Sequence, residues 1–409
     1  MPIDVLVRLW VMVFVHYFVW GSWYVTMGTY LTKTLNFSGE QVGLAYGSTA
    51  VGAMVSPFFA GIFADRFMPT QQLLGLLHLV GAGLLYWLST LTDFAEFYPV
   101  LILYTVTYMA GHGLTNTQTL HHAKAVGRDF PRVMMMGSVG WIAAGYAVSK
   151  LHLDNSPDMF RLAAAAALFM GAYSFTLPHT PAKGAGTPKS LRMLFGLDAL
   201  GLLRDRSFAV FMLCSLVICI PLSFYFNWTH LFMTESGIED AAEKMTIGQV
   251  SDVVFLLMLP LLLPRFGVKG VLLLGMTAWA VRFALFSWFA GGETSTAPLY
   301  LGIAMHGMCY DFIFVMGRMY VDRHADEKSR GAAQGLHALV TLGVGMFIGT
   351  WFAGIVGGHY AIKVDETVTH QWQSIWVIPA VLALIMTVVF LFLFRESRRD
   401  SAAAASPAA

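Results

Sequence analysis

The sequence predicts an all-α integral membrane protein with twelve spanning helices in two six-helix bundles. Three observations lead to this prediction. The 409 residues are 57% hydrophobic and 12% charged, with a mean hydropathy of +0.63, so the chain is far more apolar than an ordinary soluble domain. Apolar stretches of about twenty residues, long enough to cross a bilayer, recur along it. A long polar stretch near the middle divides them into two sets.

The predicted spans lie near residues 6–31, 41–63, 71–91, 97–118, 133–152, 159–178, 207–233, 246–265, 269–289, 298–320, 331–356 and 371–394. The first apolar run is too long for a signal-peptide core and ends in no small-residue cleavage site, so we expect it to be retained. We expect an N-terminal bundle over 1–178, a Pro- and Gly-containing cytoplasmic linker over 179–205, a C-terminal bundle over 206–396 and a disordered tail over 397–409.

Lysine and arginine predict the orientation. With the N-terminus in the cytoplasm, the outer side holds only Lys33, Lys150, Arg161, Lys244 and Lys363. Apart from Arg282 inside the ninth span, every other lysine and arginine falls on the cytoplasmic side. This asymmetry fits the positive-inside rule with both termini cytoplasmic, and the chain is expected in a bacterial cytoplasmic (inner) membrane.

Composition also argues against several functions. The net charge of +1 does not favour a nucleic-acid partner. Cys214, Cys219 and Cys309 all lie in apolar runs, where core packing is the simplest interpretation. The histidines His121 and His122 are adjacent and project to different helix faces, so they do not predict a metal site. No other cofactor is expected. An enzyme would need a nucleophile with a base, or clustered ligands, and the sequence has no such motif.

The second span ends in Gly61-Ile-Phe-Ala-Asp65-Arg66. This stretch resembles the loop signature of the major facilitator superfamily, although the usual trailing basic pair is missing. The resemblance implies a gating role for Asp65 and Arg66 on the cytoplasmic side of one bundle. The alternative is an ordinary charged loop.

A closer resemblance covers nearly the whole chain. It is carried by Trp20-Gly-Ser-Trp23, Ser56-Pro57, Tyr108 to Asn116, Asp129-Phe-Pro, Gly137-Ser-Val-Gly140-Trp141, Leu194-Phe-Gly-Leu-Asp198-Ala199, Gln249-Val-Ser-Asp252, Trp279-Ala-Val-Arg282-Phe-Ala-Leu-Phe286, Tyr310-Asp311-Phe312 and Ala333-Gln334-Gly335. In order and spacing these stretches resemble the nucleoside:proton symporters, the family of the bacterial nucleoside and xanthosine permeases. The resemblance implies proton-coupled nucleoside uptake by alternating access, through a site between the two halves near the bilayer midplane. We expect a monomer.

A nucleoside site needs polar groups for the ribose and flat apolar faces for the base. Gln249 and Asp252 share a face of the eighth span. A carboxylate in hydrocarbon costs several kcal/mol or more, so Asp252 must face a cavity, pair with a cation or bind a proton. The family places an amide and an acid here, which implies substrate binding. The alternatives are an ion pair with Arg282 for Asp252 and an interhelical hydrogen bond for Gln249.

In the tenth span, His306 and Tyr310 lie one turn apart and Asp311 follows. Tyr310 matches a base-facing aromatic position of the family, and His306 stands where an aromatic is expected. The alternative for His306 is a hydrogen-bond donor to a neighbouring helix, without substrate contact. Arg282 paired with Asp311 or Asp252 would make both charges tolerable. A proton arriving on one acid would free the arginine for the other, which gives a coupling mechanism.

Three further spans contribute candidates. In the fifth, Ser138 and Trp141 match polar and aromatic site positions, whereas Met134 replaces an arginine of the permeases. In the seventh, Phe224 is a candidate site residue, although Pro221 and Phe224 replace an amide pair of the permeases. Pro221 is also expected to break or kink the helix.

In the first span, Trp20 could line the cavity or pack between helices. The departures at Met134 and Phe224 keep a second hypothesis open, in which the same fold carries another solute such as a sugar, a nucleobase or an amphiphile.

Overall fold

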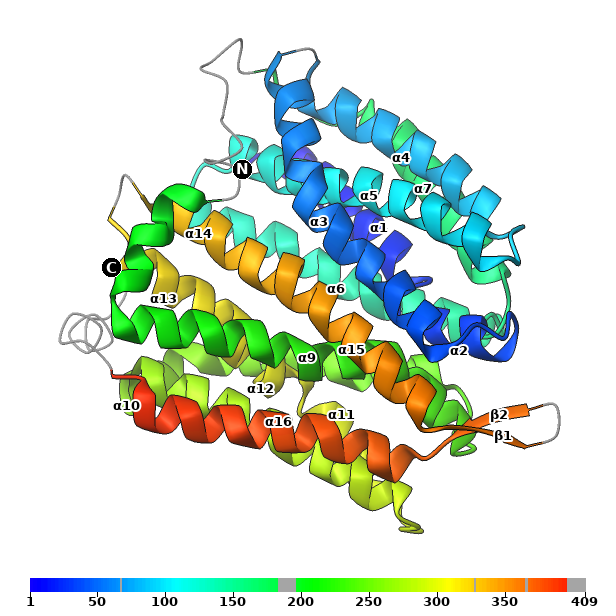
Figure 1. Cartoon of the computed structure of the whole chain (residues 1–409). Helices are drawn as coiled ribbons and strands as arrows, with labels where there is room; N and C mark the ends of the chain where they lie inside the picture. Colours follow the sequence, from blue (N-terminus) through cyan, green and yellow to red (C-terminus); the bar gives the residue numbers. More distant parts are fainter. Residues whose placement is uncertain (67, 183–195, 327–328, 365–366, 396–409) are drawn as a thin grey trace. The chain divides into compact units, whose positions relative to one another are not determined.

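The chain folds almost entirely into helices (Figure 1). The computed structural model describes residues 1–66, 68–182, 196–326, 329–364 and 367–395, apart from the side chains of residues 57–66, 126–127, 364 and 367. It divides into two compact units. Unit 1 comprises Met1–Lys189 and Gly237–Lys244, and unit 2 comprises Ser190–Ser236 and Met245–Ala409. Residues 183–195 of the predicted linker and the whole predicted tail lie outside the described residues.

Unit 1 is built from helices that pack in pairs, α1 on α6, α3 on α5 and α4 on α7. A buried apolar cluster that includes Leu9, Met12 and Leu74 joins α1 to α4 and α6. The helices are α1 (Ile3–Gly21), α2 (Met27–Lys33), α3 (Gly39–Arg66), α4 (Thr70–Leu88), α5 (Phe94–His122), α6 (Val126–Lys150) and α7 (Asp158–Ser174).

Unit 2 is organised around α9, which packs against α15 and α16. Its elements are the 3-10 helix η1 (Leu197–Arg204), α9 (Arg206–Glu235), α10 (Ala241–Ala290), α11 (Ala297–Ala304), α12 (His306–Tyr310), the π-helix η2 (Asp311–Val315), α13 (Met316–His324), α14 (Arg330–Ala338), the π-helix η3 (Leu339–Gly345), α15 (Met346–His359), β1 (Ala361–Val364), β2 (Thr367–His370) and α16 (Trp372–Leu393).

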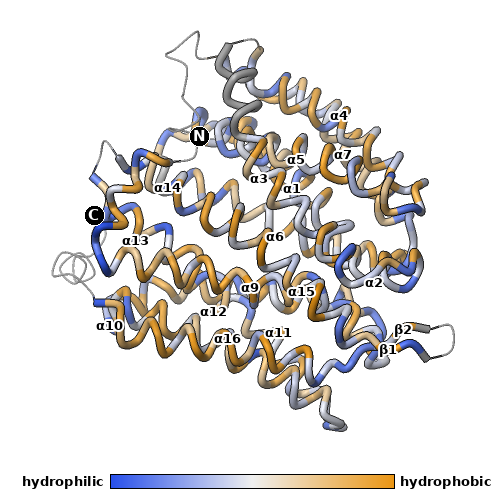
Figure 2. The backbone as a smooth tube through the Cα atoms, in the orientation of Figure 1, coloured by the Kyte–Doolittle hydropathy of each residue, from blue (hydrophilic) through white to orange (hydrophobic). Residues whose placement is uncertain are grey.

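Helices lie over every predicted span. Among the described residues, six helices are long and apolar enough to cross a membrane, and seven if α11 and the helices after it, bent by 42°, count as one span. The 50-residue α10 counts once, although the non-helical Gly267 divides it. Figure 2 shows hydrophobic residues along the helices and hydrophilic ones at the β1–β2 hairpin. The number twelve stays a prediction.

Two local features differ from the sequence-based expectations. The antiparallel hairpin β1–β2 between α15 and α16 was not expected. Pro221 was expected to break or kink its helix, and the break does not occur, because α9 is helical throughout Arg206–Glu235. Proline removes one N–H from the helix, and a long, packed helix tolerates that loss. The interruption lies instead in the tenth predicted span, at Met305.

Candidate functional site

Arg282 is the centre of a buried polar group in unit 2. Its side chain is 0% exposed in the second half of α10, which is rare for an arginine. The guanidinium carbon lies 3.6 Å from the ring centroid of Tyr225 on α9, 5.3 Å from that of Trp279 and 5.8 Å from that of Phe286. Cation–π attraction to these rings, strongest when water is excluded, partly replaces the lost hydration.

The guanidinium of Arg282 binds His306. Arg282 Nη1 donates to His306 Nδ1 at 3.0 Å. Because arginine has no acceptor, Nδ1 must carry the lone pair, which assigns the neutral His306 ring the Nε2–H form. Among the described residues, Arg282 forms no ion pair within 4.0 Å, and its Nε and Nη2 have no hydrogen-bond partner. The predicted ion pair of Arg282 with Asp252 or Asp311 is therefore not formed in this structure.

Both acids of this region carry a buried oxygen without a partner. Asp252 Oδ1 and Asp311 Oδ2 accept no hydrogen bond from any described residue, and Asp311 is only 4% exposed. Asp252 lies within electrostatic range of Asp311 and Arg282. A buried carboxylate oxygen without a partner is costly, so both acids can bind a proton or accept a hydrogen bond from a ligand, and Asp252 can approach Arg282.

The backbone around Met305 brings α12 against the predicted site in α10. The Gly307 N–H donates to Ser251 Oγ at 2.9 Å, which satisfies a donor freed by the start of a new helix. A Cβ on Gly307 would lie 2.8 Å from the Cα of Asp252, so only glycine permits this approach. Trp279 Nε1 donates to the Cys309 carbonyl at 2.9 Å, just before the wide turn of η2.

Aromatic rings continue from this polar group. His306 stacks on Tyr225 with 4.8 Å between centroids and on Tyr310 with 6.0 Å, and Tyr310 contacts Phe314 at 4.9 Å. The predicted shared face of His306 and Tyr310 is thus confirmed. Tyr310, like Asp252 and Gln249, is half-buried.

The sequence-based reasoning missed four residues that organise this group: Tyr225, Ser251, Trp279 and Gly307. Tyr225 directly follows Phe224, and Ser251 directly precedes Asp252. These positions next to candidate residues were the one sequence signal for Tyr225 and Ser251. Sequence neighbours do not tell which face of a helix lies against which other helix.

Phe224 is not part of the Arg282 group. Its fully buried ring packs against Phe352 on α15 at 6.0 Å. On the same helix, Asn227 Nδ2 and Trp228 Nε1 donate to carbonyls of α15, those of Thr350 and Ala353. This side of α9 is a helix-packing surface, whereas Tyr225 faces Arg282.

The predicted aromatic residues of unit 1 do come together. Trp20 on α1 lies 5.4 Å from Trp141 on α6 and 5.6 Å from Tyr108 on α5, ring to ring. Ser138 lies one turn before Trp141 and is half-buried. Met134 packs against the apolar cluster of α1 and α4. Asp65 and Arg66 end α3, but their side chains lie outside the described residues.

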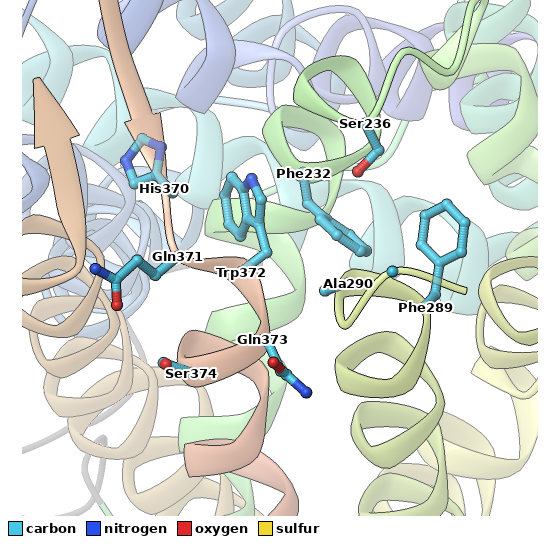
Figure 3. A pocket seen from close by; sticks show the side chains of 10 residues that line it. Phe232, Ser236, Phe289, Ala290, His370, Gln371, Trp372, Gln373 and Ser374 are labelled. Carbon is cyan, nitrogen blue, oxygen red and sulfur yellow. The ribbon is translucent and has the colours of Figure 1, made fainter. Parts of the chain in front are cut away.

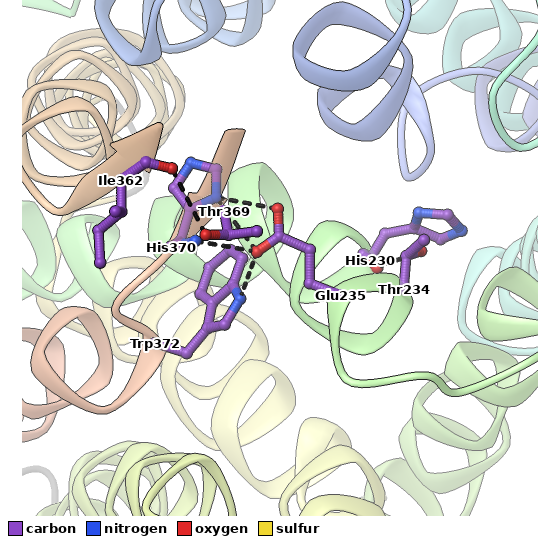
Figure 4. A network of polar contacts seen from close by, with 7 residues as sticks. All are labelled: His230, Thr234, Glu235, Ile362, Thr369, His370 and Trp372. Atoms are coloured by element: carbon purple, nitrogen blue, oxygen red, sulfur yellow. Dashed lines mark hydrogen bonds and ion pairs between the residues drawn. The ribbon is translucent and has the colours of Figure 1, made fainter. Parts of the chain in front are cut away.

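A second polar network lies at the end of α9 (Figure 4). Glu235 Oε2 accepts hydrogen bonds from Trp372 Nε1 at 2.8 Å and from the His370 N–H at 3.1 Å, and Glu235 Oε1 lies 3.1 Å from His370 Nδ1. The carboxylate thereby joins α9, β2 and α16.

A pocket of about 450 Å³ lies beside this network (Figure 3). It is lined by Phe232, Phe289 and Trp372 and by polar residues that include Gln371 and Gln373. It shares no residue with the Arg282 group. In the predicted orientation it opens on the outer side.

Comparison with known proteins gives matches over nearly the full length. A profile of the family described as Nucleoside H+ symporter matches residues 3–399. YegT of Escherichia coli (strain K12) is 38% identical over 403 residues, covering 96% of this chain and 94% of YegT. The xanthosine permease of the same organism is 32% identical over 406 residues, covering 96% of each chain.

The structural comparison agrees. A crystal structure of a mutant of the nucleoside transporter NupG is similar to this structure with a TM-score of 0.88 and 27% identity, covering 96% of this chain and 100% of that chain. The similarity covers both units.

Proposed function

Because the chain belongs to the nucleoside H+ symporter family, a family of transporters with the major facilitator fold and not of enzymes, we propose that it imports nucleosides together with protons across the bacterial cytoplasmic membrane by alternating access. The proposal includes twelve spans in the bundles 1–178 and 206–396, the linker 179–205, cytoplasmic termini and a monomer in the bilayer.

The observation that carries the proposal is the polar set formed by the buried Arg282 and Asp311 and the half-buried Asp252. It offers two guanidinium nitrogens and two carboxylate oxygens that no described residue satisfies. Such a set is expensive in an inert core. In a symporter it gives two states. In one, a proton neutralises an acid. In the other, the proton has left and the carboxylate can approach Arg282.

The substrate contacts are assigned to groups of each unit by their chemistry. Gln249 and Asp252 offer an amide and a carboxyl to the ribose hydroxyls, and Ser138 offers a hydroxyl. Tyr310 and His306 in unit 2, and Trp20 and Trp141 in unit 1, offer ring faces to the base. The proton-coupling groups are Asp252, Asp311 and Arg282. The gating role of Asp65 and Arg66 stays part of the proposal.

One observation favours a different solute on the same fold. By the family resemblance, Met134 and Phe224 stand where the permeases carry polar side chains, and in this structure both pack against apolar neighbours. Two polar side chains are therefore missing, which points to a different ribose contact or to a less polar solute, such as a nucleobase or an amphiphile, that would lose less by their absence.

Transport in proteoliposomes tests both alternatives. Vesicles containing the protein should accumulate labelled uridine or adenosine when an inward proton gradient is imposed, and protein-free vesicles should not. Accumulation without any dependence on the gradient would exclude symport. Gradient-driven uptake of another solute, without competition by any nucleoside, would select the second candidate.

A further inference from the structure

Three histidines of unit 1 meet although they lie on different helices. His16 on α1 is 0% exposed and His78 on α4 is 4% exposed. The ring of His112 on α5 lies 5.6 Å from that of His16. The proposed coupling residues Asp252, Asp311 and Arg282 all belong to unit 2, so the transport mechanism does not use this cluster.

Hydrogen bonds define the proton positions in the pair of His16 and His78. His78 Nδ1 lies 3.0 Å from the Leu74 carbonyl, which can only accept, so His78 carries its proton on Nδ1. Its Nε2 then accepts from His16 Nδ1 at 3.1 Å when both rings are neutral. The remaining nitrogen, His16 Nε2, is left as a buried lone pair without a hydrogen-bond partner among the described residues. That atom is a vacant proton acceptor.

One face of the His16 ring lies against a π-system that attracts a cation. The Tyr108 ring stacks on the imidazole at 4.5 Å with an interplanar angle of 2°, so its π-face can stabilise an imidazolium. Tyr108 OH donates to the His16 carbonyl at 2.9 Å, which fixes this stack. The ring of Tyr17, on the same helix, lies 5.7 Å away. A proton on Nε2 could also pass its charge to His78 through the existing Nδ1–H···Nε2 bond.

The ring of Tyr108 links the pair to the proposed base-binding wall. The Tyr108 ring also contacts Trp20 at 5.6 Å, and Trp20 contacts Trp141 at 5.4 Å. A charge on His16 is therefore separated from Trp20 by one ring.

Other titratable groups around the pair are few. Those that face His16 are His78 from α4, His112 and Tyr108 from α5, and Tyr17 from α1. No acid or base of α6 or α7 forms an ion pair or hydrogen bond with His16 among the described residues. The described residues also contain no group of three or more His, Cys, Asp or Glu arranged to hold a metal ion. The ligand that fits is a proton.

We propose that His16 and His78 form a second proton-binding site of the transporter, which takes up one proton at His16 Nε2 and shares it with His78 while substrate occupies the wall of Trp20 and Trp141. This proposal rests on the proposed symport. Proton binding at the pair can nevertheless be measured without transport.

Histidine ring ¹⁵N spectra of the purified full-length protein provide that measurement, because imidazolium and the two neutral tautomers have different nitrogen shifts. Spectra are recorded over about pH 5 to 8, the range in which histidine titrates. His16→Gln keeps hydrogen-bonding groups, and His16→Phe keeps the stack on Tyr108. Either variant that folds assigns the His16 signal by its loss. His121→Gln, at the exposed end of α5, is the control.

The expected result is a His16 signal that changes from neutral to imidazolium within this range, with a concerted change at His78, and whose midpoint shifts when uridine is added. In vesicles, His16→Gln should alter the pH dependence of uptake, whereas His121→Gln should keep the pH dependence of the wild type. A His16 ring that stays neutral over the whole range would overturn the proposal. If the signal titrates but no nucleoside is transported or shifts it, the proton site stands and the nucleoside assignment fails.

Discussion

Arg282 donates to His306 across two helices of unit 2, at 3.0 Å, and this bond rather than an ion pair holds the buried guanidinium. Replacing His306 by Phe keeps a ring against Tyr225 but removes the acceptor, so a third guanidinium nitrogen is left unsatisfied. We expect a loss of about 1–3 kcal/mol in stability, measured by thermal unfolding in detergent. His306→Gln, which retains an acceptor, should lose less. Equal melting temperatures of the two variants would show that the bond contributes nothing.

Replacing Asp252 or Asp311 by asparagine should remove proton coupling but leave substrate binding in place. Asp252→Asn should abolish gradient-driven accumulation of substrate while exchange of labelled for unlabelled substrate continues, because only the first process needs the proton. Asp311→Asn should behave alike if the acids share one proton. Unchanged accumulation in either variant would remove that acid from the mechanism.

The close contact of α12 with α10 makes a sharp prediction for Gly307. In Gly307→Ala the added Cβ would meet backbone atoms of α10, including the Cα of Asp252 at 2.8 Å. Backbone atoms cannot relieve such a contact by changing rotamer, as a side chain can. Overpacking of this kind costs about 1–3 kcal/mol, and the displacement of Asp252 should lower uptake. Gly113→Ala in α5, where no atom lies within 4 Å of the added Cβ, should leave uptake unchanged. Normal uptake by Gly307→Ala would mean that the site does not depend on this contact.

Glu235 should couple energetically to Trp372. A hydrogen bond to a charged group contributes about 1.5–3 kcal/mol, and Glu235 Oε2 accepts from Trp372 Nε1 at 2.8 Å. In a double-mutant cycle of Glu235→Gln and Trp372→Phe, measured by thermal unfolding, the double variant should lose less stability than the sum of the two single losses, because either substitution alone already weakens the bond. Strict additivity would show that the two side chains act independently.

Asp129 gives a pH dependence outside the predicted spans. Its carboxylate accepts from the N–H groups of Ala125 at 3.3 Å and Lys124 at 3.1 Å and from Arg128 Nε at 3.2 Å. These bonds, that from Ala125 foremost, lower the pKa of Asp129 from 3.8 to about 2. A lowered pKa means that the charged form stabilises the fold above pH 3.8 and that this stabilisation is lost as the pH falls towards 2.

Asp129→Asn should therefore melt at a lower temperature than the wild type near neutral pH, and the difference should shrink as the pH falls below about 4. Differential scanning fluorimetry over this range measures it. The exposed Asp4→Asn is the matched control and should show no such difference. A difference that persists unchanged to the lowest pH would contradict the role of the Asp129 charge.

Much of the candidate site was predictable because membrane chemistry makes some residues conspicuous. Asp252, Asp311 and Arg282 stand out in sequence as charges within apolar runs, and the structure places all three in one unit, with Arg282 and Asp311 deeply buried. Trp20 and Trp141 were expected near a site and do contact each other. The pairing was not predictable. Arg282 binds His306 instead of an acid, because which side chains meet depends on the rotation of each helix about its axis.

The sequence by itself determined that the chain is a helical membrane protein of the symporter family, since hydropathy over about twenty residues and the order of short motifs are local properties. Only the tertiary structure decided that span ten breaks at Met305 while α9 runs through Pro221, and that His16 and His78 share a hydrogen bond. These features depend on which helix faces lie against each other. Contacts between residues 62 positions apart leave no mark in either local sequence.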